Sequence, residues 1–319
     1  MHLQTPYKIN MDYKVYIYGA GYLYNELMSY IHYYDDLIKV EGILTTEKNN
    51  YSRIDGYECL TVDEAIWENI DYCIVAVYEW NDIRKKLCEL GMENKIIRSH
   101  IFRIPNFDFE KYIKLKNSEM TILCNYCLGG HLYREFGLKE LSPTINMFCS
   151  GMQYIDFLEN YEYYLSFDMK EKIGDIEHRD GTIGIEEFWP HGIVGGEEKT
   201  VEWVLNHDIE PGISVRKWNS RRCRVNYDNI VAIMIIQSDQ EAYAFDKLNI
   251  ERKIGFYYKN LGLENVICIN EWSNKKNIIE FDSMFPFFVN NYMRNFAKEV
   301  PIIDWMKFFN GEKEFVRKI

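Results

Sequence analysis

The sequence lacks a long hydrophobic run, a secretory leader and a complete catalytic motif. Its longest uninterrupted apolar stretches, Tyr72–Tyr78 and Ile230–Ile236, hold seven residues each, whereas a helix that spans a bilayer needs about 20. Residues 1–10 carry polar side chains and no apolar segment of the kind found in signal peptides. We therefore expect no transmembrane segment and a cytoplasmic location.

Positive charge is also scarce. The chain has 37 Lys and Arg against 49 Asp and Glu, a net charge of −12, which disfavours nonspecific binding to nucleic acid or to anionic membranes. Its eight cysteines show no spacing typical of a disulfide scaffold and indicate reduced thiols. What remains is a globular chain of 319 residues with 47% hydrophobic residues, a length that suggests two domains.

The first third of the chain alternates strand and helix patterns. Apolar strands are expected at Tyr13–Tyr18, Ile38–Leu44 and Tyr72–Val77, and helices at Tyr22–Ile31, Val62–Trp67 and Ile83–Leu90. This alternation is typical of α/β folds and predicts a Rossmann-like, doubly wound parallel sheet over residues 1–105.

A glycine pair follows the first expected strand. Gly19 and Gly21 match the start of the G-x-G-x-x-G pattern, in which glycines let the backbone approach a diphosphate at a helix N-terminus. The third glycine position holds Tyr24, and Glu47 lies where an acidic residue would bind a ribose hydroxyl. These residues predict a nucleotide or nucleotide-sugar site; the alternative is a tight turn that binds nothing.

A second, larger α/β domain is expected over residues 118–319, with the boundary between Pro105 and Ser118. Its expected strands are Met120–Asn125, Asn229–Ile236, Ile254–Tyr258 and Val266–Asn270. Its expected helices are His131–Phe136, Gln153–Tyr164, Thr200–Asn206, Gly212–Arg222 and Glu241–Leu248. Ser238 is expected to cap the last of these helices.

Ligands of open α/β sheets bind beyond the carboxyl ends of the strands. In the second domain this rule selects three loops, Asn125–His131, Gln237–Asp239 and Asn270–Trp272. They contain side chains that can act as nucleophile, base or acid. The candidate catalytic residues are Cys127, His131, Asp239 and Glu271.

The cysteines near this first loop invite two chemical readings. Cys124, Cys127 and His131 have zinc-like spacing, but no second pair supplies a fourth ligand, so we predict no metal site. Cys127 precedes a helix, where the dipole and exposed N–H groups stabilise a thiolate nucleophile. A buried structural thiol is the alternative.

A basic segment stands out in this acidic chain: Arg216, Lys217, Arg221, Arg222 and Arg224 place five positive charges within nine residues. Arginines bind phosphate or carboxylate in bidentate fashion, and a neighbouring tryptophan, Trp218, could stack on a base or sugar. We expect an anionic ligand here. The alternative is a solvated helix paired with acidic side chains such as Glu197, Glu198 and Glu202.

Aromatic residues crowd the C-terminal stretch. We expect them to be core residues of terminal helices, and a homo-oligomer surface is the alternative. They are Phe285, Phe287, Phe288, Tyr292, Phe296, Trp305, Phe308 and Phe309.

Two blocks within residues 119–260 resemble a bacterial family, domain of unknown function 1919, whose members often carry the label exopolysaccharide-biosynthesis protein. The blocks are Cys-Asn-Tyr-Cys-Leu-Gly-Gly-His-Leu-Tyr (124–133) with Leu-Ser-Pro-Thr-Ile-Asn-Met-Phe (141–148), and Lys-Trp-Asn-Ser-Arg-Arg-Cys-Arg-Val-Asn (217–226). Leu128 departs from the pattern, which usually has tryptophan there. The positions that match are Asn125, Cys127, Gly129, Gly130, Tyr133, Ser142, Pro143, Asn146, Trp218, Arg221, Arg224 and Asn226.

The resemblance implies a surface-polysaccharide context. Together with the basic helix, it leads us to expect a transferase that uses a nucleotide sugar or another phosphate-bearing donor, with Arg221 and Arg224 on the phosphates. Most of the matching positions are then candidate substrate-binding residues. The alternative is a non-catalytic module that binds nucleotide sugars or serves as a scaffold in such a pathway. The sequence names no cofactor.

Overall fold

The computed structural model describes residues 13–33, 38–48, 51–104, 107–172, 190–205, 211–269 and 303–316. They form a mixed α/β protein in which parallel strands dominate two of three sheets. The backbone packs into two compact units that divide between Lys114 and Leu115, inside helix α3 (Phe109–Lys116). We name the described residues up to Lys114 unit 1 and those from Leu115 onward unit 2.

Unit 1 is built around a six-stranded sheet in the order β3-β4-β2-β1-β5-β6. All neighbouring strands are parallel except β3 and β4, which form a hairpin. Counted along the chain, the parallel strands run 3-2-1-4-5, so the order reverses between β1 and β5. The strands are β1 (Val15–Tyr18), β2 (Val40–Thr45), β3 (Arg53–Ile54), β4 (Tyr57–Thr61), β5 (Tyr72–Val75) and β6 (Ile96–Arg98).

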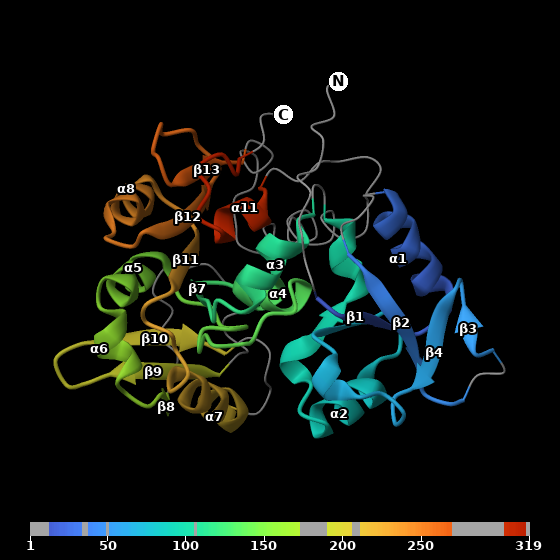
Figure 1. The fold of residues 1–319 in the computed structure, drawn as a ribbon. Helices are drawn as coiled ribbons and strands as arrows, with labels where there is room; N and C mark the ends of the chain where they lie inside the picture. Colours follow the sequence, from blue (N-terminus) through green and yellow to red (C-terminus); the bar gives the residue numbers. More distant parts are fainter. Residues whose placement is uncertain are drawn as a thin grey trace. The chain divides into compact units, whose positions relative to one another are not determined.

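Helices α1 (Tyr22–Tyr33) and α2 (Asn81–Glu89) follow β1 and β5 (Figure 1). Ile83 and Leu87 of α2 pack on the sheet face that carries Tyr18, Leu44 and Cys73. All four residues of β5 are buried, as expected for a continuous apolar run in the middle of a parallel sheet.

One expectation for unit 1 is wrong. Residues 62–66 are not helical; a turn leads into a single 3₁₀ turn, Trp67–Asn69. The β3–β4 hairpin before it turns at Asp55 and Gly56, with φ of 50° and 85°. Asp-Gly is a common pair in such two-residue turns because both positions need positive φ.

Unit 2 contains a four-stranded parallel sheet in the order β13-β12-β11-β7, which makes β7 an edge strand. The strands are β7 (Thr121–Cys124), β11 (Ile230–Ile235), β12 (Arg252–Tyr257) and β13 (Val266–Cys268). A second, antiparallel sheet has the order β10-β9-β8, with strands β8 (Lys170–Glu171), β9 (His191–Gly195) and β10 (Thr200–Val204).

The helices of unit 2 lie between these strands along the chain, except α11, which follows the last strand (Figure 1). They are α4 (Leu128–Glu135), α5 (Gly151–Glu159), α6 (Tyr161–Leu165), α7 (Pro211–Arg222), α8 (Asp239–Lys247) and α11 (Trp305–Phe309). Their core contains two fully buried tryptophans, Trp203 and Trp218, whose rings lie 5.4 Å apart beside Phe157.

Three sequence expectations for unit 2 need correction. Residues 200–204 are strand β10 and not a helix: Val201 and Trp203 alternate with outward residues, and the run pairs antiparallel with β9. α4 begins at Leu128, three residues before the expected start. The helix expected from Gln153 to Tyr164 is broken at Asn160 into α5 and α6.

The described part of the C-terminal aromatic stretch belongs to the core of unit 2. Trp305, Phe308 and Phe309 are buried, with Trp305 against Phe256 and Phe309 against Phe136. The remaining aromatics of that stretch, residues 285–296, lie outside the described residues.

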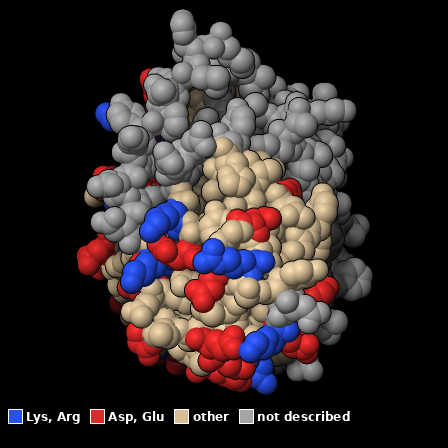
Figure 2. Space-filling view, turned by 45° about the vertical axis from the view of Figure 1, so that its right-hand side comes forward, with Lys and Arg blue, Asp and Glu red and all other residues tan. Residues whose placement is uncertain are grey.

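Charged side chains of both signs are mixed on one face of the described protein (Figure 2). On the face drawn in Figure 2, basic and acidic side chains are interspersed among uncharged ones. The net charge of −12 therefore does not form one acidic field on the described part of that face.

Candidate functional site

The carboxyl ends of β7, β11 and β12 meet at one edge of the parallel sheet, because these strands are parallel neighbours. Two of the three loops selected from the sequence lie at this edge: Asn125–His131 after β7 and Gln237–Asp239 after β11. The third, Asn270–Trp272, lies outside the described residues, and so does the candidate Glu271.

Asn125 joins the first two strands at this edge. Its side chain is buried; Oδ1 accepts a hydrogen bond from Ile235 N at 2.9 Å and Nδ2 donates to Ile235 O at 3.1 Å. The amide thus acts as one further rung between β7 and β11, and both of its polar atoms serve the sheet.

The two glycines after Cys127 allow close packing. A Cβ on Gly129 would lie 2.9 Å from Cys124 Cβ, and one on Gly130 would lie 2.5 Å from Asn146 Oδ1. Asn146 itself has a positive φ of 60°. Cys127 is buried at the N-cap position of α4, and burial raises the pKa of the neighbouring Cys124 thiol to about 11.

Other residues of the family-like pattern satisfy the open edge of β7. Tyr133 Oη accepts from Ile122 N at 2.8 Å and donates to Met120 O at 2.9 Å. Thr144 Oγ1 accepts from Cys124 N at 3.1 Å and also contacts Ser142 Oγ at 3.0 Å. An edge strand has unpaired backbone groups, and here side chains pair with them.

The candidate acid and base residues from the sequence make local contacts. Asp239 Oδ1 accepts from Lys259 Nζ at 2.8 Å and from Tyr257 Oη at 2.5 Å. The hydrogen bond from Lys259, followed by that from Tyr257, lowers the pKa of Asp239 below its ordinary value. His131 Nδ1 contacts Arg134 Nη2 within α4.

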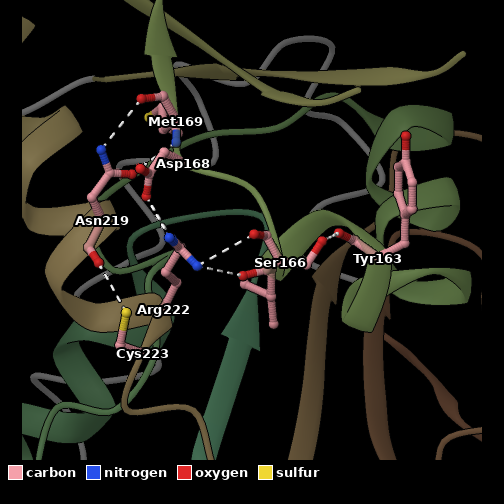
Figure 3. A network of polar contacts seen from close by, with 8 residues as sticks. Tyr163, Ser166, Asp168, Met169, Asn219, Arg222 and Cys223 are labelled. Carbon is pink, nitrogen blue, oxygen red and sulfur yellow. Dashed lines mark hydrogen bonds and ion pairs between the residues drawn. The ribbon is translucent and has the colours of Figure 1, made fainter. Parts of the chain in front are cut away.

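The basic helix α7 uses its polar side chains to hold a neighbouring loop. Arg222 Nε and Nη2 donate to Asp168 Oδ1 at 2.8 and 2.6 Å, and Nη1 donates to Leu165 O and Ser166 O at 3.3 and 3.4 Å. Asn219 pairs with the backbone of Met169 (Figure 3). Arg222 therefore has a structural role in the described protein.

Asn226, the last residue of the block 217–226, lies at the amino end of β7. Arg221 pairs with Glu140 at 2.7 Å, and Asn226 donates to Thr121 Oγ1 and Glu119 O. The turn from Cys127 to Gly130 lies beyond the carboxyl end of the same strand. Trp218 is fully buried against Trp203, and Arg224 is exposed. Asn226 therefore makes its contacts at the opposite end of β7 from the turn at Cys127.

The structure brings together a group that sequence reasoning missed. His191 Nδ1 lies 2.5 Å from Glu202 Oε1, and Lys172 Nζ lies 3.0 Å from both carboxylate oxygens of Glu202. His191 is buried, and the Glu202 side chain is 22% exposed. The hydrogen bond from His191, together with Lys172, lowers the pKa of Glu202 to about 2, so this carboxylate stays ionised.

This group connects to the first turn of α5 at the carboxyl edge of the sheet. Glu202 N donates to Gln153 Oε1 at 3.0 Å, and Phe148 pairs with Val204 of β10 through two backbone hydrogen bonds. Cys149 N donates to Asn125 O at 3.2 Å. The segment from Phe148 to Gln153 thus leads from the end of β7 to the antiparallel sheet.

A second glutamate lies against the same helix end. The Glu241 side chain is buried; Oε2 accepts from Gln237 N at 2.9 Å, and a Cβ on Gly151 would lie 2.1 Å from its carboxyl carbon. Burial raises the pKa of Glu241 above its ordinary value. We name Lys172, His191, Glu202 and Glu241 the α5 cluster, since all are tied to the first turn of α5 directly or through Glu202.

Two glutamates with opposite pKa shifts near one helix end are a pattern of acid–base sites. Signals for them exist in the sequence. The alternation of Val201 and Trp203 with Glu202 indicates a strand that places Glu202 on its outer face, and Ser238-x-x-Glu241 is a capping-box pattern. Ser238 does cap α8, since its side chain accepts from Glu241 N at 3.2 Å.

In unit 1 the glycine loop lies where the strand order reverses. Gly19 has a φ of 100°, and a Cβ there would lie 2.7 Å from Val77 Cγ1, so this position requires glycine. Around Gly21 no atom lies within 4 Å of an added Cβ. Tyr24 is buried and donates to Asp55 Oδ2 at 3.0 Å, while Glu47 is exposed after the end of β2.

Comparison with known proteins identifies the larger part of the chain. Residues 98–307 match the family described as domain of unknown function (DUF1919). The chain belongs to this family. Residues 11–97 match the family described as C2185-like, N-terminal. A relative in Haemophilus influenzae, described as "Uncharacterized protein", is 21% identical over 188 residues, which is 53% of this chain and 84% of the relative.

The DUF1919 match includes β7, the α5 cluster and α7, and the C2185-like match includes the glycine loop. Among the described residues of this DUF1919 member, no helix has the length and apolar character needed to cross a membrane.

Proposed function

We propose that this DUF1919 protein is a group transferase of surface-glycan assembly that uses a phosphate-bearing activated donor, with the α5 cluster as its acid–base centre. The observation that supports this most is the contact of the buried His191 with Glu202, a carboxylate whose pKa is about 2. A carboxylate on one ring nitrogen fixes the tautomer and orientation of a histidine that moves a proton at the other.

In this proposal His191 Nε2 takes the proton of an acceptor hydroxyl as the hydroxyl oxygen bonds to the donor. The phosphate leaves with the electron pair of the broken bond. Lys172 balances the charge of Glu202, and Glu202 stabilises the imidazolium that forms when His191 accepts the proton. Glu241, whose pKa is raised, is a group that can carry a proton near the same helix end.

The glycan context comes from the resemblance of residues 119–260 to proteins labelled for exopolysaccharide biosynthesis. We also propose that unit 1 is Rossmann-like, which the 3-2-1-4-5 order of its parallel strands supports. A cytoplasmic location agrees with the thiols: all eight cysteines lie in described residues and none forms a disulfide.

A donor screen with the full-length protein tests this function. UDP-, GDP- and CMP-sugars are supplied with a bacterial glycan extract as acceptor, and release of the nucleotide is measured. We expect turnover of at least one donor, and His191→Gln and Glu202→Gln to be slower by about 10²-fold or more, as for the loss of a general base.

Glu198→Gln is the matched control, because Glu198 is exposed in the turn of the same β9–β10 hairpin and loses the same charge. Melting temperatures of all variants verify folding. Turnover by His191→Gln at the wild-type rate, or no turnover of any donor, contradicts the proposal.

A non-catalytic module is the second candidate, and the contacts of the sequence-derived residues favour it. Asn125 serves the sheet and Asp239 is held by Tyr257 and Lys259. Such a module predicts that cells carrying His191→Gln at normal abundance keep their surface glycan, whereas the transferase predicts its loss.

A further inference from the structure

Unit 1 contains a stack of one tryptophan and two arginines. The guanidinium carbons of Arg84 and Arg98 lie 5.4 and 5.0 Å from the centroid of the Trp80 ring. Arg98 is the last residue of β6 and pairs in register with Val75 at the end of β5, and Trp80 is the N-cap of α2. The stack therefore lies at the carboxyl ends of β5 and β6.

Trp80 follows soon after β5, one of the two strands between which the strand order reverses. There the loop after β1 touches the loop after β5, since an added Cβ on Gly19 would lie 2.7 Å from Val77 Cγ1. An exposed tyrosine follows each strand: Tyr22, the first residue of α1, is 71% exposed, and Tyr78, in the loop after β5, is 68% exposed. Ligands of open parallel sheets bind at such reversal points.

The chemistry of these side chains indicates a ligand with both a flat ring and a phosphate. Exposed aromatic faces stack on nucleobases and sugars, and an arginine that lies over a ring keeps its N–H edge for an anion. Arg84 makes no ion pair with any carboxylate in the described chain. Glu79 and Asp82 are exposed in the same segment, so the ligand has to be held by stacking as well as by charge.

We propose that a nucleoside diphosphate, alone or as the carrier of a sugar, binds in unit 1 over the ends of β5 and β6. Arg84 and Arg98 contact its phosphates, and Tyr78 stacks on its base. This inference rests on the proposed function in one respect, namely that the donor is phosphate-bearing. The site is a separate one: the donor reacts at the α5 cluster of unit 2, and unit 1 binds a nucleotide of the same chemical class independently.

The direction of the ligand follows from what occupies the other side of the glycine loop. Toward β2, Tyr18 Oη bonds Thr46 Oγ1, and the third glycine position is filled by the buried ring of Tyr24. A dinucleotide whose ribose reached Glu47 would extend over that side. The exposed rings and the arginine stack are on the side of β5 and β6, so Glu47 does not contact the ligand.

Calorimetric titration of the full-length protein tests the site with UDP, ADP, uridine, pyrophosphate and NAD. We expect UDP or ADP to bind and Arg84→Ala to weaken that binding about tenfold or more, the usual effect of a lost charge-assisted hydrogen bond. Tyr78→Ala should weaken nucleotide binding and leave pyrophosphate unchanged. Lys85→Ala, an exposed neighbour on α2, and Glu47→Gln should bind as the wild type does.

Absence of UDP and ADP binding at millimolar concentration overturns the inference, as does wild-type affinity in Arg84→Ala or NAD binding that depends on Glu47. The proposed function is separable from this result. Glu202→Gln should lose transfer but keep UDP binding, so an active wild-type enzyme with an indifferent Arg84→Ala variant refutes only the site in unit 1.

Discussion

The Glu202 carboxylate provides the sharpest quantitative prediction, because its contribution to stability has a defined pH dependence. A pKa lowered from 4.5 to about 2 in the folded protein corresponds to about 3 kcal/mol at 1.36 kcal/mol per unit. A lowered folded-state pKa stabilises the protein above the unfolded-state value. This stabilisation is complete above pH 4.5 and is lost as the pH falls toward 2.

We therefore expect Glu202→Gln to lower the free energy of unfolding by up to about 3 kcal/mol at pH 7, and the difference from wild type to shrink through the acid range. Urea denaturation at pH 7, 5, 4 and 3 measures this, with tryptophan fluorescence as the signal, since Trp203 is buried next to Glu202 in β10.

Glu198→Gln, which removes an exposed charge from the same hairpin, should stay within about 0.5 kcal/mol of wild type at each pH. A Glu202→Gln deficit that is the same at pH 3 as at pH 7 would refute the electrostatic argument, because it would show a loss of shape or hydrogen bonding that no proton controls.

Three further predictions concern other contacts of unit 2. Glu241→Gln should raise the free energy of unfolding at pH 7 and leave it unchanged at pH 4, as measured by denaturation curves. A raised pKa in the folded state disfavours the folded protein at every pH at which the carboxyl of the unfolded chain is ionised. A lower stability of the variant at pH 7 contradicts this prediction. Gly151→Ala should lower the free energy of unfolding by about 2–4 kcal/mol, since its methyl would lie 2.1 Å from the Glu241 carboxyl carbon. Adding Glu241→Ala to this variant should recover part of the loss. If the effects of the two substitutions simply add, the predicted clash between them is wrong. Arg222→Ala should lower the free energy of unfolding by about 1–2 kcal/mol, because it removes hydrogen bonds to Asp168, Leu165 and Ser166. Arg216→Ala, at an exposed position of the same helix, should change thermal stability little. Equal losses in the two variants would contradict the structural role of Arg222.

The elements that sequence patterns located well are those with one dominant signal. β1, β5 and β11 are apolar runs buried in parallel sheets, and α8 begins at its Ser238 cap. Both hairpins were missed, for a physical reason. These strands have only two to five residues, so periodicity has few positions on which to act, and the apolar content of Thr200–Val204 also suits a buried helix.

The sequence predicted only part of the candidate site, again because the pairing of short strands leaves little signal in the sequence. The rule of strand carboxyl ends led to the loops after β7 and β11, which the structure places at one edge. His191 and Glu202 are distant from these loops along the chain, and only the register of the β9–β10 hairpin and the pairing of Phe148 with Val204 bring them there. Neither pairing has a local signal in the sequence.

The edge position of β7 explains why polar side chains of the kind that can bind ligands lie along this strand and just beyond it. A parallel strand with one neighbour leaves backbone groups unpaired on its other side, and polar side chains must pair with them if that side is buried. Tyr133 and Thr144 do this along the strand, and Asn125 continues the pairing with β11 beyond its end. These residues therefore hold the sheet edge that supports α5.

Polar side chains that form hydrogen bonds with the backbone differ in charge and proton affinity from those that can transfer a proton to a substrate. Amides and hydroxyls such as Asn125, Tyr133 and Thr144 fill the first role without ionising. The α5 cluster instead contains one carboxylate with a lowered pKa and one with a raised pKa, the former on a buried histidine. A fold does not need such a pair for stability, since burial disfavours the ionised form of Glu241 in the folded protein, and this is the reason to look for catalysis at the end of α5.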